Sequence, residues 1–176
     1  TKRGRGGDGW TADENTWTDL SDRRVGSYAR SKTLAERAAW DLLKELGGST
    51  TMATVNPSLV LAPPLSPTGA EGSVQVAERL LTGRVPGVPA LGFNVVDARD
   101  VADLQVRALP PRAAAGQRFI AAGAYAWMGE MAEILRAGLP PEQASKVPTR
   151  KVPNFAVRLA SIFDKDLRFV TPRLRH

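Results

Sequence analysis

Cysteine is absent from the 176-residue chain, and its single histidine, His176, is the last residue. Without cysteine, the chain has no disulfide scaffold, no thiolate nucleophile and no cysteine-ligated zinc or iron–sulfur site. One histidine excludes a site built from two or three histidines and argues against a Ser-His-Asp triad. We therefore predict no metal site and look for chemistry carried by other side chains.

Long apolar runs are also missing. No run approaches 18 residues, so no transmembrane helix is predicted, and no signal-peptide pattern opens the chain. From these two absences we expect a cytoplasmic protein with no membrane partner. Residue 1 is Thr rather than Met, so we expect the native N-terminus to lie upstream.

Positive charge is concentrated at one end of the chain. Residues 146–176 hold eight Lys or Arg side chains and two Asp, which accounts for the whole net charge of +6. A nucleic-acid-binding domain would be basic over a whole face. We therefore interpret the helical pattern over 155–163 as a solvated face and expect no nucleic-acid partner. Binding of an anionic surface or nucleic acid through 146–176 stays open as a third hypothesis.

The remaining composition, 43% hydrophobic and 24% charged, is that of an ordinary globular domain. The clearest element is a helix over residues 28–46, with Ser27 as its N-cap and Gly47–Gly48 as its stop. Its small and apolar side chains recur with the 3.6-residue period of a helix face. That predicted inward face consists of Leu34, Ala35, Ala38, Ala39, Leu42, Leu43 and Leu46.

Strands and helices alternate along the rest of the chain. Further helices are predicted over 72–82, 97–109 and 125–138, and strands over 51–62, 91–96 and 117–122. Pro57 splits or kinks the first of these strands, and residues 1–26 are predicted to be a polar loop. The alternation predicts an α/β class with mainly parallel pairing.

The string GRGGDG at residues 4–9 matches a dinucleotide-binding fingerprint literally. That fingerprint needs a buried strand before it and a helix after it, so that a pyrophosphate can sit on the helix N-terminus. Neither surrounds residues 4–9. We predict a loop there and reject the match.

Tyr28 and Lys32 form the pattern Tyr-x-x-x-Lys on the predicted helix. Residues four apart lie on one helix face, about 5–6 Å apart at Cβ. A free phenol, with a pKa of about 10, exchanges protons poorly near neutrality, and a nearby ammonium favours the phenolate. Such a hydroxyl can exchange a proton with a carbonyl or alcohol oxygen while hydride moves at carbon.

Four motifs then follow one another in a fixed order: YARSKTLAERAAW, TVNPSLVLAPP, VVDARDVADLQVRAL and PTRKVPN. In this order the chain resembles the extended short-chain dehydrogenase/reductase family, its NAD(P)-dependent epimerase/dehydratase group, and within it the dihydroflavonol-4-reductase-like members. The resemblance runs from about Trp17 through nearly the whole chain. It implies the C-terminal half of a Rossmann-like doubly wound parallel sheet plus a small substrate-binding lobe.

The resemblance implies a role for individual residues. Tyr28 would be the catalytic acid/base, and Lys32 would favour its phenolate and hydrogen-bond the nicotinamide ribose of NAD or NADP. The residues that would line the nicotinamide end of the cofactor site are Pro57, Ser58, Leu59 and Val60. The substrate would be a small carbonyl compound or alcohol, and a homodimer is left open. Asp97 is interpreted as a helix cap, with Asp100 or Arg99 in a local ion pair.

The resemblance also implies a domain division. Residues 1–62 would be the second half of the cofactor-binding domain, and 63–176 mostly the substrate-binding lobe, with 91–109 returning to the core. The family's N-terminal glycine-rich half and its catalytic Ser or Thr have no counterpart here, and Ala62 replaces a Gly. We therefore expect a central and C-terminal part that is incomplete for catalysis alone. The alternative is a non-catalytic α/β fragment or interaction module.

Overall fold

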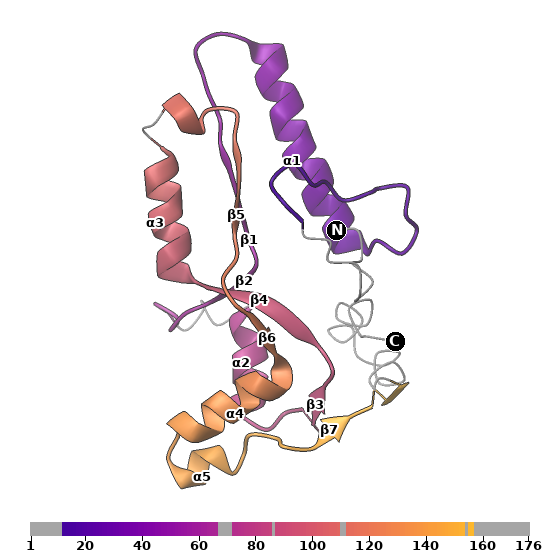
Figure 1. The fold of residues 1–176 in the computed structure, drawn as a ribbon, viewed down its shortest axis with the longest axis vertical. Coiled ribbons are helices and arrows are strands. Elements are labelled where there is room, and N and C mark those ends of the chain that lie inside the picture. The colour runs from indigo at the N-terminus through magenta and orange to yellow at the C-terminus, as the bar shows by residue number, and fades with distance from the viewer. Residues whose placement is uncertain (1–11, 67–71, 86, 110–111, 154, 157–176) are drawn as a thin grey trace. The chain divides into compact units, whose positions relative to one another are not determined.

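The computed structural model describes residues 12–66, 72–85, 87–109, 112–153 and 155–156 (Figure 1). They divide into two compact units. Unit 1 draws its described residues from Thr1–Asn56 and Ala102–Ala121, and unit 2 from Pro57–Val101 and Ala122–His176. The assignment of 1–62 to a cofactor domain and of 63–176 to a substrate lobe stays a prediction.

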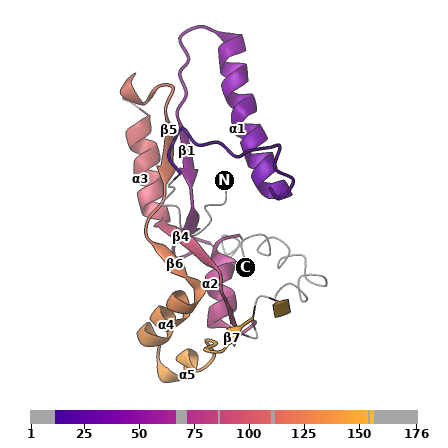
Figure 2. The ribbon, with the colours of Figure 1, turned by 45° about the vertical axis from the view of Figure 1, so that its right-hand side comes forward.

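Unit 1 places a pair of strands between two helices. Its elements are α1 (Ser27–Leu46), β1 (Thr54–Pro57, up to Asn56), the C-terminal part of α3 (Ala98–Ala108), the 3-10 helix η2 (Arg112–Ala114) and β5 (Arg118–Ala121). Strands β1 and β5 are hydrogen-bonded neighbours. In both Figure 1 and Figure 2, α1 and α3 lie on opposite sides of this strand pair, which is the layering expected of a doubly wound sheet.

The ends of α1 follow from its glycines. The helix predicted over 28–46 is confirmed, but Ser27 as its N-cap is wrong, because Ser27 is the first helical residue and the extended Gly26 is the cap. At the other end, Gly47 (φ 59°) donates its N–H to the carbonyl of Leu43, and Gly48 has φ 82°. These are left-handed conformations that favour glycine, so the predicted stop is confirmed.

The predicted inward face of α1 is mostly wrong. Leu34, Leu42 and Leu46 are 52%, 53% and 71% exposed. The face turned inward instead carries Thr33, which is buried, and the half-buried Glu36. The positions of apolar side chains could not predict this face, because Glu36 lies on it through an ion pair with Arg118, a residue far along the chain.

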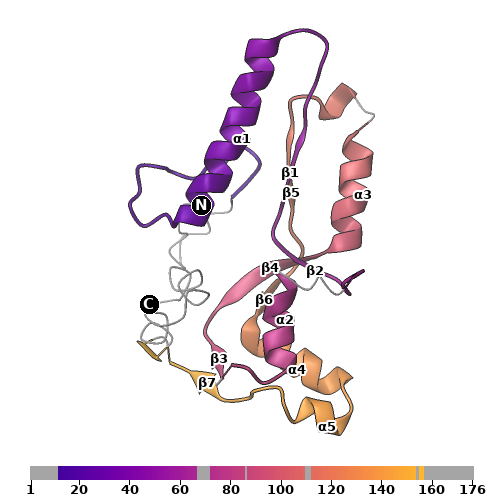
Figure 3. The same ribbon diagram turned by 180° about the vertical axis from the view of Figure 1, so that it is seen from behind.

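Unit 2 contains most of the strands. Its elements are β2 (Leu59–Leu61), α2 (Val74–Leu81), β3 (Val88–Pro89), β4 (Gly92–Asp97), the first turn of α3, β6 (Tyr125–Trp127), α4 (Met128–Gly138), α5 (Pro141–Ala144) and β7 (Lys151–Val152). Strand β4 lies between β2, its parallel neighbour, and β6, its antiparallel neighbour. Strands β3 and β7 form a second, parallel pair (Figure 3). The α/β class with parallel pairing is confirmed.

The core of unit 2 is apolar. Leu80, Leu91 and Val147 are the largest side chains that are completely buried, at 0%, 2% and 1% exposure. Val88, Met128 and Ala132 complete the cluster. Leu80 of α2 and Met128 and Ala132 of α4 thus face this core, whereas Ile134 of α4 is 69% exposed.

Three expectations for local structure have different outcomes. The split of the strand over 51–62 at Pro57 is confirmed, since Ser58 separates β1 from β2. The helix predicted over 125–138 begins three residues late, because Tyr125–Trp127 is a strand that pairs with β4. The helix predicted over 155–163 and most of the basic segment 146–176 lie outside the described residues. No helix in the described ranges is long and apolar enough to cross a membrane.

Candidate active site

The predicted pair, Tyr28 and Lys32, occupies the first two turns of α1. The Nζ atom of Lys32 lies 5.7 Å from the centroid of the Tyr28 ring, within the range of a cation–π contact. The two side chains therefore share one side of the helix, as their four-residue spacing predicts. The ammonium therefore lies beside the phenol ring.

The surroundings of the pair are open. Tyr28 is 51% exposed, and Lys32 is also exposed. Ser31, the polar residue of the same motif, donates its hydroxyl to the Tyr28 carbonyl at 2.8 Å. Ser31 thus bonds to the helix backbone, whereas the phenol ring and the ammonium of the neighbouring pair face solvent.

The four residues predicted to contact cofactor belong to unit 2. Pro57 is exposed, and Leu59 and Val60 are half-buried in β2, where they align with Val95 and Val96 of β4. Ser58 occupies the bend before β2, and its Oγ is buried without a hydrogen-bond partner among the described residues. A buried hydroxyl that lacks a partner is uncommon in folded proteins, so this bend offers a ligand one unsatisfied polar group.

Unit 1 contains a polar cluster that the sequence did not predict. The Glu36 carboxylate, on α1, accepts hydrogen bonds from Arg118 Nε at 2.8 Å and from Arg118 Nη2 at 3.0 Å, which makes a two-pronged ion pair with β5. Thr54 and Asn56 of β1 donate to the same carboxylate at 2.8 and 3.3 Å. The side chains of Arg118 and Glu36 are only 17% and 12% exposed.

These contacts determine the ionisation of Glu36. The hydrogen bonds from Arg118 are the main cause that lowers the pKa of Glu36 from 4.5 to about 2, with a smaller contribution in the same direction from Thr54, while burial acts in the opposite direction. Glu36 is therefore a carboxylate at neutral pH. The sequence motif includes Glu36, but its partner lies 82 residues away, and no spacing rule could have identified it.

Arg118 also holds the segment that precedes α1. Its guanidinium lies 3.8 Å from the centroid of the Trp17 ring, and its Nη1 donates to the carbonyls of Glu14 and Thr16. Arg37 of α1 lies 5.3 Å from the same Trp17 ring. One half-buried cation thus connects the loop around residue 16, the helix α1 and the strand β5.

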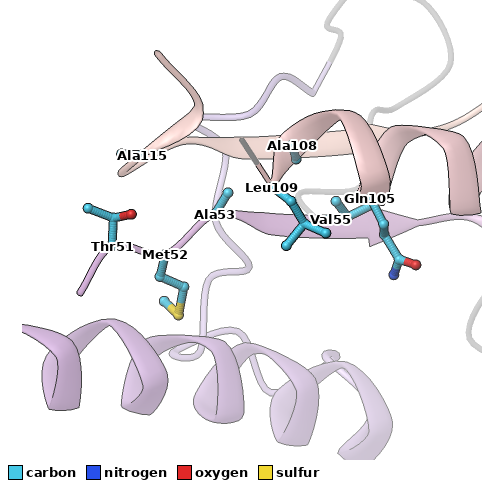
Figure 4. Close-up of a pocket in the computed structure, with 8 residues that line it drawn as sticks. All are labelled: Thr51, Met52, Ala53, Val55, Gln105, Ala108, Leu109 and Ala115. Carbon is cyan, nitrogen blue, oxygen red and sulfur yellow. The ribbon is translucent and has the colours of Figure 1, made fainter. Parts of the chain in front are cut away.

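Two cavities open in unit 1. One, of about 260 Å³, lies between β1 and the end of α3 and is lined mainly by small and apolar side chains, as Figure 4 shows. The other, of about 360 Å³, is lined by Trp17, Trp40 and charged side chains of α1. Neither is lined by Tyr28 or Lys32. The described residues also contain no cluster of His, Asp or Glu that could hold a metal ion.

Asp97 has the structural role that was predicted for it. Its carboxylate accepts the backbone N–H of Arg99 at 2.8 Å at the start of α3 and forms an ion pair with the Arg99 guanidinium at 2.6 Å. The hydrogen bonds from Arg99 lower the pKa of Asp97 to about 2. The cap and the local ion pair are therefore confirmed.

Comparison with curated proteins identifies relatives that are named as reductases. The chain is 38% identical to cinnamoyl-CoA reductase 1 of Arabidopsis thaliana over 130 residues, which cover 73% of this chain and 37% of that protein. It is 33% identical to the ketoreductase azaE of Aspergillus niger over 146 residues, covering 79% and 43%. The chain thus spans less than half the length of these relatives. No family model matches the chain.

Comparison with solved structures also identifies reductases. The yeast methylglyoxal/isovaleraldehyde reductase Gre2, solved in complex with NADPH, superimposes with a TM-score of 0.61 at 28% identity, over 69% of this chain and 37% of that one. The predicted Rossmann-like α/β class is confirmed by this similarity.

Proposed function

Because the chain belongs to the extended short-chain dehydrogenase/reductase family, we propose that the protein is an NAD(P)-dependent oxidoreductase of the reductase/epimerase type. Its reaction is hydride transfer between a nicotinamide and a ketone or secondary alcohol. The observation that carries the proposal is the placement of the Lys32 ammonium 5.7 Å from the Tyr28 ring on an exposed side of α1.

The roles of the two side chains follow from their chemistry. In the reducing direction, the Tyr28 hydroxyl donates its proton to the carbonyl oxygen as the carbonyl carbon gains hydride, and in the oxidising direction the phenolate accepts that proton. The Lys32 ammonium stabilises the negative charge that develops on the phenol oxygen. Lys32 has three N–H donors, so it can also hold a ribose hydroxyl.

One feature of the structure, the buried hydroxyl of Ser58, fits a nicotinamide cofactor. The Ser58 Oγ is buried without a partner in the part of the chain that the structure describes, and a carboxamide can supply the missing hydrogen bond. We propose that Pro57, Ser58, Leu59 and Val60 line the nicotinamide end of the cofactor site. Tyr28 and Lys32, of unit 1, are proposed separately as cofactor-binding residues. When bound, the cofactor supplies the hydride donor or acceptor.

Finer features of the proposal come from the relatives. The yeast methylglyoxal reductase Gre2 was solved with NADPH, and the name of the same protein describes it as NADPH-dependent. We therefore favour NADPH over NADH and a small aldehyde or ketone as substrate. A dihydroflavonol-4-reductase-like specificity, a cytoplasmic location and a substrate-binding lobe within 63–176 belong to the same proposal.

The test is made on the full-length protein with a series of aldehydes and ketones. Tyr28→Phe removes only the hydroxyl group, and with it the exchangeable proton, so we expect kcat to fall about 10²–10⁴-fold, the usual contribution of general acid catalysis. NADPH affinity, measured by fluorescence titration, should stay within about threefold, because the hydroxyl acts mainly in the transition state. Undiminished turnover by Tyr28→Phe would refute the role.

The substitution Lys32→Met tests the role of the ammonium in the same assays. Loss of the ammonium should lower kcat and also weaken NADPH binding, because Lys32 has both roles. The matched control is Lys44→Met, which removes another cation from the same helix, one whose side chain is 78% exposed and pairs with Asp41 at 3.7 Å. Equal effects of the two lysine substitutions would show that general charge, rather than the Tyr28–Lys32 pair, supports turnover.

One observation favours the alternative, a non-catalytic interaction module. Leu34, Leu42 and Leu46 lie on the outer side of α1 and are more than half exposed, and exposed apolar side chains along one helix face are typical of protein interfaces. This alternative, which includes a homodimer, predicts association that increases with protein concentration and no NADPH binding. Sedimentation and NADPH titration of the same sample separate it from the reductase.

A further inference from the structure

We propose that Glu36 is a positioning residue for the Tyr28–Lys32 pair, a role that rests on the function proposed above. Tyr28, Lys32 and Glu36 follow one another at four-residue spacing on α1. They therefore fall within about 80° of arc around the helix axis. Glu36, two turns beyond Tyr28, forms hydrogen bonds to both strands of unit 1.

The contacts of Glu36 reach both strands of unit 1. Arg118 of β5 donates two hydrogen bonds to it, and Thr54 and Asn56 of β1 donate one each. Because these donors belong to two different strands, we expect them to define the rotation of α1 about its axis and its position along the strands. A single ion pair on a flexible surface side chain could not do so.

The same cluster fixes the segment that leads into α1. Arg118 bonds to the carbonyls of Glu14 and Thr16 and stacks on Trp17. Only nine residues lie between Trp17 and Ser27, where α1 begins. The start of the helix, which carries Tyr28, is thus constrained from the preceding loop as well as from Glu36.

The energetics favour a geometric role over a purely stabilising one. A buried ion pair is often no more stable than well-packed apolar residues of similar volume, because both charges lose their hydration. What the pair supplies is direction, since a carboxylate and a guanidinium bond best in one planar arrangement. An apolar contact at position 36 would leave α1 free to rotate.

Small rotations matter at this distance. A side-chain atom at the outer radius of a helix, about 5–6 Å, moves by about 1 Å for each 10° of rotation. A displacement of about 1 Å in a catalytic group can cost about 100-fold in rate. Release of Glu36 should therefore impair the Tyr28 proton transfer even though Glu36 does not touch the substrate.

The first experiment compares Glu36→Gln with Asp41→Asn in the full-length protein. Both substitutions replace a carboxylate by an amide on α1, but the Asp41 side chain is 67% exposed. Both variants are assayed under conditions in which circular dichroism shows them folded. We expect Glu36→Gln to lower kcat about 10–100-fold, while the KM for NADPH and the KM for the carbonyl substrate each stay within about threefold of wild type. Asp41→Asn should keep the wild-type kcat. A wild-type kcat in Glu36→Gln overturns the proposal.

Arg118→Lys sharpens the result, because lysine keeps the charge but not the planar fork. If geometry is the function of the cluster, kcat of Arg118→Lys should fall between those of wild type and Glu36→Gln. A full rescue by lysine would show that only the charge of residue 118 matters and would contradict the positioning role.

A readout without turnover keeps the proposal separate from the proposed function. Crystal structures of wild type and Glu36→Gln should differ by about 1 Å or more in the position of α1 against β1, as a rotation of about 10° requires. An unmoved helix overturns the positioning role. If the wild-type protein reduces no carbonyl compound, the proposed function fails, and the displacement of α1 still decides whether Glu36 positions the helix.

Discussion

Unit 1 and unit 2 differ in the kind of contact that stabilises each of them internally. In unit 2, the most buried side chains are apolar and form one cluster that includes Leu80 and Leu91. In unit 1, the described side chains that are buried are small, such as Thr33 and Ala114, and the interactions between its elements centre on Glu36 and Arg118. The stability of unit 2 should thus depend on packed volume, and that of unit 1 on charge.

The difference matters for function because the candidate catalytic helix belongs to the charged unit. Apolar packing tolerates volume-conserving exchange with little loss, whereas a buried ion pair loses much of its value when either partner is removed. A unit that must hold Tyr28 and Lys32 in one orientation gains from contacts with a defined direction.

Removal of one partner from the buried pair should have the largest effect. Arg118→Met leaves the Glu36 carboxylate buried without its cation, which typically costs about 3–5 kcal/mol. Urea unfolding followed by tryptophan fluorescence measures the loss, since Trp17 stacks on Arg118. A loss below about 1 kcal/mol, the range of an exposed ion pair, would mean that the charged cluster does not hold unit 1.

Truncation in the apolar core should come next. Leu80 is completely buried in unit 2, and Leu→Ala at such a site typically costs about 2–5 kcal/mol through lost burial and a residual cavity. This cost should be independent of pH between neutrality and mild acid, which calorimetry at several pH values can verify. A pH-dependent cost would remove the distinction between the two units.

Acid should weaken unit 1 selectively. The folded pKa of Glu36, about 2, lies below its usual 4.5, so the unfolded chain binds more protons between these values and stability rises with pH there. The contribution of Glu36 is complete above about pH 5, is lost as the pH falls towards 2, and amounts to about 3 kcal/mol at most.

The acid prediction has a direct control. In Glu36→Gln, which cannot titrate at position 36, the fall in stability between about pH 5 and pH 2 should be smaller by that amount. Acid titration of both proteins, followed by circular dichroism, gives the difference. Identical acid profiles for the two proteins would exclude Glu36 as the titrating group.

An exposed ion pair in the same unit should have the smallest effect. Arg107 and Asp103 pair at 2.8 Å on α3, but their side chains are 77% and 59% exposed. Arg107→Ala should therefore cost no more than about 0.5 kcal/mol, in line with exposed helix pairs. Urea unfolding gives the value, and a cost equal to that of Arg118→Met would show that burial does not distinguish the two pairs.

Local pattern was enough to predict many of the elements. Helices α1 and α2 were expected over 28–46 and 72–82, because helical periodicity and glycine stops are read within a few residues. Strand β6 was missed, because Tyr125–Trp127 is a strand only through its pairing with β4, some thirty residues earlier. Propensity carries no information about such a partner.

In the candidate site, too, some features could be predicted from local spacing and others could not. Tyr28 and Lys32 could be placed on one face from their spacing alone, since a helix fixes the geometry of residues four apart. Glu36 belongs to the same motif, but its role depends on Arg118, 82 residues later. The prediction of the inward face of α1 was wrong for this reason, because an acidic side chain lies on an inward face only where a cation, here a distant one, pairs with it.

The most direct test of the whole account follows the hydrogen that reaches the substrate. The full-length protein is incubated with NADPH that carries two deuterium atoms at C4 of the nicotinamide and with a ketone in ordinary water, and the alcohol is analysed by mass spectrometry. The account predicts one deuterium on the carbinol carbon and ordinary hydrogen on the oxygen, with the same labelling but much slower formation in Tyr28→Phe. An alcohol without deuterium on that carbon would contradict hydride transfer.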